Sequence, residues 1–340
     1  MKHSALIGLG MVADTYADAF RNSQRVAMHS IFARSLHSQE KFLLAYPDVC
    51  DRIATSVDAI ARDPEIDFVI LATPPNARRE IVETLAKAQV PILMEKPVER
   101  SLEKADDLVS LCDDLGCHLG IMLQHRARPV VGQLRERLDE LGHLVAVEVN
   151  VPWWRPQSYY DEPGRGTYER DGGGVLINQA IHTLDLMLSL TAPVSEVTAM
   201  SATTSTHDME SEDFVVAGLA FSNGAVGQVF ASTASFPGRG ETIILHGSNG
   251  SARLEAGVVT LDWRNGSSET IGEAAASGAG ADPMAFTSDW HRTVIEDFAD
   301  SLDEDRAPMV TGWEALQVHA LISAIDTASR TGQRITLGRN

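Results

Sequence analysis

The feature that most restricts the fold is a regular alternation of short apolar segments and helical patterns over the first 123 residues. Five segments with few polar residues read as strands buried on both faces, at 4–10, 26–33, 67–73, 90–94 and 117–123. Between them lie helical stretches at 12–22, 36–46, 77–88 and 102–116. Ser101 opens the last of these as an N-cap. The repeated order predicts βαβ units and a doubly wound parallel sheet, an α/β fold.

Gly8, Gly10 and Ala13 form a G-x-G-x-x-A pattern between the first strand segment and the first helical stretch. In a dinucleotide-binding fold, Gly8 makes the tight turn and Gly10 lets the backbone approach the pyrophosphate. The pyrophosphate binds at the helix N-terminus, so we expect Met11 and Val12 to lie beside it. An ordinary strand-to-helix turn could carry the same glycines, but the βα units downstream favour a nucleotide site.

The end of the second strand segment bears on which nucleotide binds. An NAD site usually has an acidic residue there, which accepts hydrogen bonds from the ribose hydroxyls. Residues 31–36 read IFARSL and contain no acid. Arg34 can form a charge-assisted fork to a 2′-phosphate and Ser35 can bond the same group, so the sequence predicts that NADP is preferred over NAD. The alternative is that Arg34 is a solvated loop residue.

Two more strand segments end in residues that stop a sheet. The segment ATPPNA (72–77) places Thr73, Pro74 and Asn76 where they would line the cofactor crevice, and Asn76 can cap the following helix. A simple turn and cap is the alternative.

The other segment, MEKP (94–97), places Lys96 at the end of a buried strand. Lysine is a poor strand residue and is rarely buried, and Pro97 bars the ladder from continuing. This pattern indicates that an amine is needed at a fixed place.

Composition limits the partners of the chain. Its 340 residues carry a formal net charge of -19, whereas phosphate binding requires clustered Lys and Arg, so we expect no nucleic-acid partner. No stretch approaches the roughly 20 apolar residues of a membrane span and no signal-peptide pattern is visible, so we expect no membrane association. Cys112 and Cys117 fit no common zinc spacing. With Cys50, they are expected to be free thiols in a reducing cytoplasm.

The pattern changes after residue 124. Three segments alternate as half-buried antiparallel strands do, at 144–154, 213–235 and 241–263. An Asn-Gly turn is expected to divide each of the last two into a pair of strands. Helices are expected at 177–190, 290–302 and 312–330. The run at 272–282 is typical of a mobile surface loop. We therefore expect a nucleotide-binding domain over residues 1–123 and an α+β domain over 124–340.

A polar face interrupts the apolar helix at 177–190. Asn178, His182 and Asp185 are spaced by four and three residues, so they share one face, and a glycine run precedes them. A lone histidine is more often structural, but three such residues on one face favour a site. A zinc site needs about three protein ligands and no third ligand is spaced nearby, so we expect no metal.

The segment at 153–168 is rich in aromatic and arginine side chains. Trp154, Arg155 and Tyr160 offer rings and donors that suit a sugar ring, and we expect them to bind substrate. The alternative is a subunit or domain contact.

The motifs GLGMVA, ATPPNA, MEKP, QHRARP and GGGVLINQAIHTLDL occur in an order and spacing that resembles the glucose-fructose oxidoreductase, inositol dehydrogenase and rhizopine-catabolism (Gfo/Idh/MocA) family. The resemblance covers nearly the whole chain. It implies a Rossmann domain followed by an α+β domain with a large, mainly antiparallel open sheet, which binds substrate and joins homodimers or homotetramers. The substrates it implies are cyclic polyols, sugars and nucleotide sugars.

The same resemblance implies roles for individual residues. Lys96 would lie beside the nicotinamide and bond the reacting hydroxyl or carbonyl, with Glu95 by the nicotinamide ribose. His182 would assist proton transfer. Many members carry an acid where this chain has Asn178, which can orient a hydroxyl but cannot be a general base. From QHRARP, Gln124 would bind cofactor and Arg126 would bind substrate.

These observations lead to one interpretation and two alternatives. We expect a cytoplasmic NAD(P)-dependent dehydrogenase that acts on a hydroxyl or ketone of a sugar-like ring. A cofactor-binding regulator without turnover is one alternative, against which the presence of both Lys96 and His182 speaks. The other is an enzyme that keeps its nucleotide bound and shuttles hydride between two sugars.

Overall fold

The computed structural model describes residues 1–273 and 287–338, so most of the loop expected at 272–282 lies outside the described residues. The chain forms two compact units, each described below by itself. The first comprises Met1–Gln124 and Ser288–Leu316, and the second comprises His125–Thr287 and Gln317–Asn340. Within the described ranges, no helix is both long enough and apolar enough to cross a membrane.

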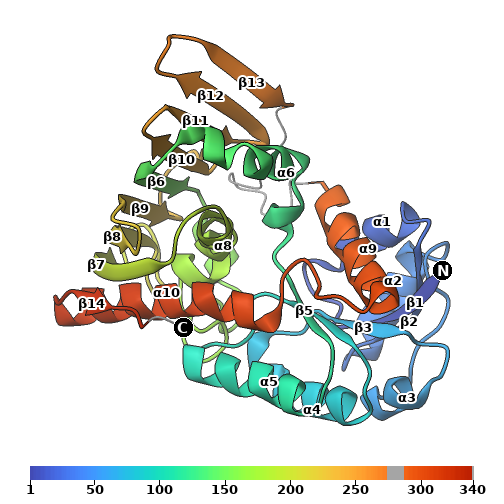
Figure 1. Cartoon of the computed structure of the whole chain (residues 1–340). Coiled ribbons are helices and arrows are strands. Elements are labelled where there is room, and N and C mark those ends of the chain that lie inside the picture. Colours follow the sequence, from blue (N-terminus) through green and yellow to red (C-terminus); the bar gives the residue numbers. More distant parts are fainter. Residues whose placement is uncertain (274–286, 339–340) are drawn as a thin grey trace. The chain divides into compact units, whose positions relative to one another are not determined.

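The first unit is a parallel five-stranded sheet in the order β2-β1-β3-β4-β5, with helices on both faces (Figure 1). The strands are β1 (Lys2–Ile7), β2 (Val26–Phe32), β3 (Phe68–Leu71), β4 (Ile92–Glu95) and β5 (Leu119–Met122). The helices are α1 (Ala13–Arg21), α2 (Leu36–Ala45), α3 (Val57–Arg62), α4 (Arg79–Lys87), α5 (Leu102–Asp114) and α9 (Asp289–Glu304). Every residue of β3, β4 and β5 is buried, which is why these strands are apolar in sequence except for Glu95 at the end of β4. The doubly wound α/β fold is confirmed, and Ser101 caps α5 as expected.

A further strand of this sheet is reduced to a single residue pair. Ile53 forms an isolated parallel bridge with Ile31 of β2. Ile31 N donates to Arg52 O at 3.0 Å, and Ala54 N donates to Ile31 O at 2.9 Å. Counting this bridge as a strand yields the order 3-2-1-4-5-6 of dinucleotide-binding folds. In such sheets the ligand binds where the order reverses, between β1 and its neighbour β3, outside the carboxyl ends of the strands.

Helix α9 packs on the sheet of the first unit, although it follows residue 124 by a long stretch of chain. Phe298 is fully buried, with its ring 5.3 Å from that of Phe68. A Cβ built on Gly120 would lie 2.7 Å from the Phe298 ring, so the glycine in β5 makes room for it. The apolar face of α9 thus brings 288–316 into the first unit, whereas the sequence-based division placed every residue after 123 in the second domain.

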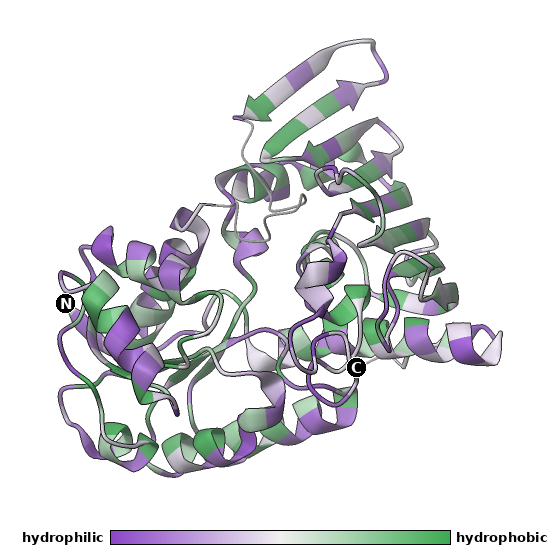
Figure 2. Cartoon of the chain, turned by 180° about the vertical axis from the view of Figure 1, so that it is seen from behind, coloured by the Kyte–Doolittle hydropathy of each residue, from purple (hydrophilic) through white to green (hydrophobic). Residues whose placement is uncertain are grey.

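The second unit is built on a nine-stranded mixed sheet in the order β13-β12-β11-β10-β6-β9-β8-β7-β14. Its strands are β6 (Leu144–Pro152), β7 (Val194–Ala202), β8 (Phe214–Phe221), β9 (Val226–Ser232), β10 (Thr242–Gly247), β11 (Gly250–Glu255), β12 (Val258–Trp263), β13 (Ser268–Gly272) and β14 (Ile335–Thr336). Only β6 and β9 pair in parallel among these strands; the other neighbours are antiparallel. Green and purple segments both occur along the β12–β13 hairpin in Figure 2. Burial alternates residue by residue along β8, as expected for a strand with one apolar face.

The helices of this unit are α6 (Pro129–Glu136), α7 (Gln157–Tyr160) and α8 (Ile181–Leu190), with short 3-10 turns at Gln124–Ala127 and Leu138–Leu141. Helix α8 lies beside β6, and α10 (Gly312–Thr331) crosses the division between the units. The Asn223–Gly224 hairpin between β8 and β9 is confirmed.

The expectation of two strands over 241–263 is wrong, because the structure has three. A second tight turn at Ala256–Gly257 separates β11 from β12, and both of its residues have positive φ, 47° and 83°. Alanine rarely adopts that conformation, so its presence at the turn conceals the hairpin from pattern reading.

Candidate active site

Gly8 and Gly10, directly after β1, differ in what surrounds them. Gly8 has φ of +104°, and a Cβ there would lie 2.7 Å from the carbonyl carbon and oxygen of Ala72 and 2.8 Å from Thr73 N. A Cβ built on Gly10 has no such neighbour within 4 Å among the described residues. The protein itself therefore needs the first glycine, whereas the second leaves room for a ligand close to the backbone.

The N-terminus of α1 lies next to these glycines. Val12 is its N-cap, and no side chain caps the helix there. Ala13 is buried against the sheet, and Met11 is 43% exposed. First-turn N–H groups without a side-chain cap, at the positive end of a helix dipole, suit a pyrophosphate. These residues fit a dinucleotide.

The end of β2 presents the two residues on which the cofactor choice depends. Arg34 lies two residues past the strand and is exposed; it forms no ion pair with any described residue. Ser35 is the N-cap of α2, and its Oγ accepts from Ser38 N at 3.2 Å. Its hydroxyl proton stays available, since a hydroxyl can donate and accept together.

The turn after β3 carries Thr73, Pro74 and Asn76. The expectation that Asn76 caps the next helix is wrong: it lies inside a 3-10 turn (Pro75–Ala77), and the N-cap of α4 is Arg78, whose side chain does not cap the helix. Pro74 and Asn76 are both exposed.

Two buried polar atoms lie near the carboxyl ends of strands. Thr73 Oγ1, after β3, and Gln124 Oε1, after β5, are buried without a hydrogen bond to any described residue. Buried polar atoms are normally paired. Such atoms at this edge of the sheet are what a bound nucleotide would satisfy.

Glu95, the last residue of β4, is buried in a set of polar contacts around Lys96. Glu95 Oε1 accepts from the Tyr16 hydroxyl at 2.9 Å, and Oε2 accepts from Lys96 N at 3.1 Å. Burial raises the pKa of Glu95, and the charge of Lys96 opposes this rise. Lys96 itself is half-buried, and the bond that joins it to Pro97 is cis.

Tyr16 and His291 complete this set of contacts, and sequence analysis missed both. Burial raises the pKa of Tyr16 well above its usual 10, so the hydroxyl keeps its proton and donates to Glu95. Burial, and then the charge of Lys96, lowers the pKa of His291 to about 3, so that imidazole is neutral. Its ring lies edge-on to that of Tyr16, with centroids 5.6 Å apart. A buried carboxylate at a strand end requires hydrogen-bond donors. The sequence therefore indicated that Glu95 has polar partners, but not which residues they are.

In the second unit, the three polar residues expected on one helix face at 177–190 lie in two different helical segments. A π-helical turn (Leu176–Ala180) precedes α8, so Asn178 lies in a wider turn than an α-helix has. Asn178 Nδ2 donates to Gly173 O at 2.8 Å and to Gly174 O at 3.1 Å. The amide therefore holds the glycine run that precedes the helix.

The glycine run is itself packed tightly. A Cβ on Gly174 would lie 1.8 Å from the carbonyl oxygen of Glu212. The Glu212 carboxylate accepts from Gly174 N at 3.0 Å and from Leu176 N at 3.1 Å, so it caps the helix start. Burial raises the pKa of Glu212, and these backbone donors oppose the rise.

His182 lies on α8 and is buried beside other polar side chains of the second unit. Its ring stacks on that of His125, with centroids 4.9 Å apart. Arg128 Nη2 lies 2.8 Å from His125 Nε2 and donates to Glu241 Oε1 at 2.6 Å. Because arginine can only donate, His125 Nε2 is the acceptor in this contact. Sequence analysis missed His125.

Arg126 and Asp185 form a buried two-bond pair. Arg126 Nε donates to Asp185 Oδ2 at 2.8 Å, and Nη2 donates to Oδ1 at 2.7 Å. Their side chains are 8% and 1% exposed. Two of the Arg126 nitrogens are thus engaged with α8, and a substrate contact by this residue stays a prediction.

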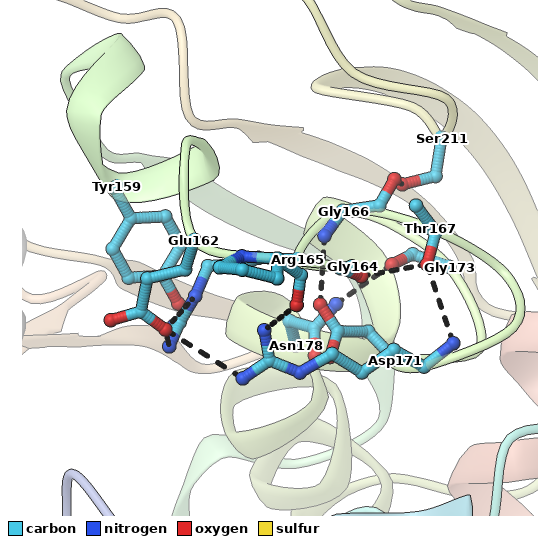
Figure 3. A network of polar contacts seen from close by, with 12 residues as sticks. Tyr159, Glu162, Gly164, Arg165, Gly166, Thr167, Asp171, Gly173, Asn178 and Ser211 are labelled. Carbon is cyan, nitrogen blue, oxygen red and sulfur yellow. Dashed lines mark hydrogen bonds and ion pairs between the residues drawn. The ribbon is translucent and has the colours of Figure 1, made fainter.

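The aromatic segment at 153–168 is ordered by its own contacts (Figure 3). The Arg165 guanidinium lies 4.4 Å from the centroid of the Tyr159 ring and bonds the Glu162 carboxylate. The side chain of Asp171 accepts from Gly166 N at 2.8 Å. These contacts are made within the chain and give the segment a defined shape.

The three substrate-binding candidates of this segment differ in exposure. Arg155 is 2% exposed, and its Nη1 donates to Trp154 O at 2.8 Å. Tyr160 is 7% exposed, and its hydroxyl lies 2.7 Å from Thr233 Oγ1. Trp154 is only partly buried and lies edge-on to the exposed ring of Phe236, with centroids 5.3 Å apart. Of the three, Trp154 is the most accessible for stacking on a ring.

Two family models match the chain. The model described as "Oxidoreductase family, NAD-binding Rossmann fold" matches residues 2–123, and that described as "GFO/IDH/MocA C-terminal domain" matches residues 131–253. Together they cover most of both units.

Individual relatives are distant. An uncharacterised protein of Saccharomyces cerevisiae, YMR315W, is 24% identical over 60% of this chain, and the match spans 59% of that protein. The 1,5-anhydro-D-fructose reductase of Ensifer adhaerens is 27% identical over 82% of each chain. A crystal structure of the WlbA dehydrogenase from Bordetella pertussis, in complex with NADH and UDP-GlcNAcA, is 26% identical with a TM-score of 0.84, covering 100% of this chain and 98% of that one.

Proposed function

Because the chain belongs to the GFO/IDH/MocA oxidoreductase family, we propose that it transfers a hydride between a nicotinamide cofactor and a hydroxyl or ketone of a sugar, polyol or nucleotide sugar. One observation carries the proposal: Lys96 follows β4 at the same edge of the parallel sheet as the glycine turn after β1 and Thr73 after β3. The carboxyl ends of parallel strands meet at one edge, so an amine is held where the nucleotide fold places its ligand.

The cofactor would be held by residues described above. The turn of Gly8 and Gly10 and the start of α1 would take the pyrophosphate, and Thr73 and Gln124 would offer their unpartnered polar atoms. When bound, the nicotinamide supplies the hydride chemistry. The protein then has to position the substrate and move one proton.

Lys96 is our candidate for that proton. Its amine would bond the reacting oxygen and take or return the proton, with the Glu95 carboxylate beside it. His182 is a second acid–base candidate. Asn178 cannot act as a base, and because its amide donors hold the glycine run, its effect on substrate would be one of positioning.

The substrate class is supported by two relatives. One is named a 1,5-anhydro-D-fructose reductase, and the other was crystallised with UDP-GlcNAcA. Both names indicate a sugar ring. The partly exposed ring of Trp154 suits stacking on such a ring.

For the cofactor we propose NADP in preference to NAD. Arg34 is exposed and unengaged by any described carboxylate, and no acid ends β2, so the 2′-phosphate would meet a free guanidinium. The family model specifies only NAD binding, and the WlbA complex contains NADH.

We propose that the protein is a homodimer or homotetramer joined through the nine-stranded sheet. Met200, Val216 and Phe230 lie opposite one another across β7, β8 and β9, and none of the three is fully buried. Such an apolar row would be covered by a second copy. A monomeric mass in light scattering at micromolar concentration would contradict this proposal.

The proposal also places the enzyme in the cytoplasm. Its three cysteines, Cys50, Cys112 and Cys117, are free thiols, as expected in a reducing compartment. Fractionation of the source cells, with the protein detected by antibody, tests the location.

The decisive test of the function is Lys96→Met, with Lys104→Met as the control because Lys104 is exposed on α5. Reduced-cofactor absorbance is followed with a panel of sugars, polyols and nucleotide sugars. Lys96→Met should lower turnover by roughly 10²–10⁴-fold, the effect of removing a positioned acid–base group, and leave cofactor affinity nearly unchanged. Wild-type turnover in Lys96→Met would contradict the assignment, and absence of turnover by the wild type on the whole panel would favour a regulator.

A further inference from the structure

Arg78 is an arginine with an unusual set of partners. It is 1% exposed and directly precedes α4. Its Nε and Nη2 both donate to Thr73 O, at 3.0 and 2.7 Å. Its Nη1 donates to three further carbonyl oxygens, those of Glu95 (2.5 Å), Pro97 and Val98 (3.3 Å). One side chain therefore binds the main chain on both sides of Lys96 and the main chain at the end of β3.

A buried cation is costly unless its charge and its N–H groups are matched. Burial lowers the pKa of Arg78 to about 10, and the negative charges of Glu95 and Glu99 oppose that fall. At neutral pH the guanidinium therefore remains charged. Its direct hydrogen-bond partners are backbone carbonyl oxygens and not a carboxylate. The contacts of Arg78 therefore hold the main chain in place.

We infer that Arg78 is a positioning residue. Its guanidinium links the backbone around Lys96 to the backbone of the Thr73 turn. The Lys96 amine and the cofactor-binding turn are thereby held at a fixed distance and orientation from each other. The inference rests on the proposed function, which assigns the amine its reaction. Arg78 touches neither substrate nor cofactor in this role and acts through the two turns.

The geometry explains why arginine is required. A planar guanidinium presents N–H groups in several fixed directions, so it reaches two turns at once. A lysine ammonium keeps the charge but is a single point at the end of a flexible chain. Arg78→Lys therefore removes the bridge while retaining the cation. The adjacent Arg79 is exposed on the first turn of α4, and Arg79→Lys is the matched control.

The experiment compares wild type, Arg78→Lys and Arg79→Lys in three measurements. The thermal midpoint without cofactor reports folding. Calorimetric titration with reduced cofactor provides the Kd and the number of competent sites. Steady-state kinetics then provide kcat per competent site and KM. For Arg78→Lys we expect kcat per competent site to fall by roughly 10- to 100-fold, as a displacement of about 1 Å does, with weaker cofactor binding. Arg79→Lys should match wild type in all three.

A role in folding alone predicts a different result. Arg78→Lys would then have a lower thermal midpoint but wild-type kcat per competent site and Kd, which would overturn the inference. If Arg78→Lys does not fold, Arg78→Gln is measured in the same way, and failure of both to fold would also overturn it. The proposed function fails separately: if Lys96→Met is fully active, that function is wrong, whereas inactive Lys96→Met with fully active Arg78→Lys refutes only the inference about Arg78.

Discussion

Replacing Gly8 and Gly10 by alanine, one at a time, should separate a glycine that the fold needs from one that the ligand needs. Gly8 has φ of +104° and its Cβ would meet the backbone of Ala72 at 2.7 Å. The left-handed backbone costs an L-residue about 1–2 kcal/mol, and forcing an extra methyl against fixed atoms costs about 1–3 kcal/mol. Gly8→Ala should therefore lose about 2–5 kcal/mol of unfolding free energy, the sum of these two terms.

Gly10→Ala should show the opposite behaviour. Among the described residues, no atom lies within 4 Å of its Cβ, and its φ is not in the left-handed region, so the apo protein should keep its stability or gain about 0.4–1 kcal/mol from a stiffer unfolded chain. Its methyl would occupy the space that we assign to the pyrophosphate. Losing one charge-assisted hydrogen bond, worth about 1.5–3 kcal/mol, should weaken cofactor binding by roughly 10- to 150-fold.

The assay pairs thermal unfolding of the apo proteins with calorimetric titration of reduced cofactor. Gly116→Ala is the control for backbone conformation, because Gly116 also has positive φ (65°) but among the described residues the atom nearest to its Cβ is the Gln89 side-chain oxygen, 3.9 Å away. Gly116→Ala should lose only the part of the unfolding free energy that the left-handed backbone costs an L-residue. Wild-type cofactor affinity in Gly10→Ala would refute the assignment of the pyrophosphate to this turn, and a Gly8→Ala loss equal to that of Gly116→Ala would refute the clash.

Three further predictions concern single side chains. Arg34→Ala should bring NADP(H) and NAD(H) affinities to parity or reverse them in calorimetry, and an unchanged ratio would leave Arg34 as a loop residue. His182→Ala should cut turnover by roughly 10²–10⁴-fold, whereas Asn178→Ala should mainly raise KM; equal, small effects would indicate a purely structural helix. Because the folded-state pKa of His291 is about 3, the unfolded chain binds the extra proton below about pH 6.5, and stability falls as pH drops from there toward 3. Urea titrations at pH 7 and pH 5 measure this loss of unfolding free energy. In His291→Gln the loss should be smaller by about 1.4 kcal/mol per pH unit, and a loss equal to that of wild type would contradict the lowered pKa of His291.

Much of the first unit could be predicted because its signals are local. Strands buried on both faces appear as apolar runs, and the helices between them show their own period, so β1 to β5 and the helices α1, α2, α4 and α5 were predicted to within a few residues. Helix α3 (Val57–Arg62) and the Ile53 bridge, both between β2 and β3, were not predicted. The glycine pattern after β1 and the Asn-Gly hairpin between β8 and β9 are also local, since each depends on the backbone freedom of one or two residues.

The tertiary structure decided which distant residues meet. Arg78 and Arg79 are adjacent and identical in type in the sequence. In the structure, however, Arg78 is buried and donates to the backbone oxygens of four residues, whereas Arg79 is exposed. His291 lies far along the chain from Glu95, and α9 packs within the first unit, where Phe298 fits over Gly120. Residue periodicity reports which side of an element is apolar but not which remote element covers it, because that choice depends on the summed packing and desolvation of segments far apart in the chain.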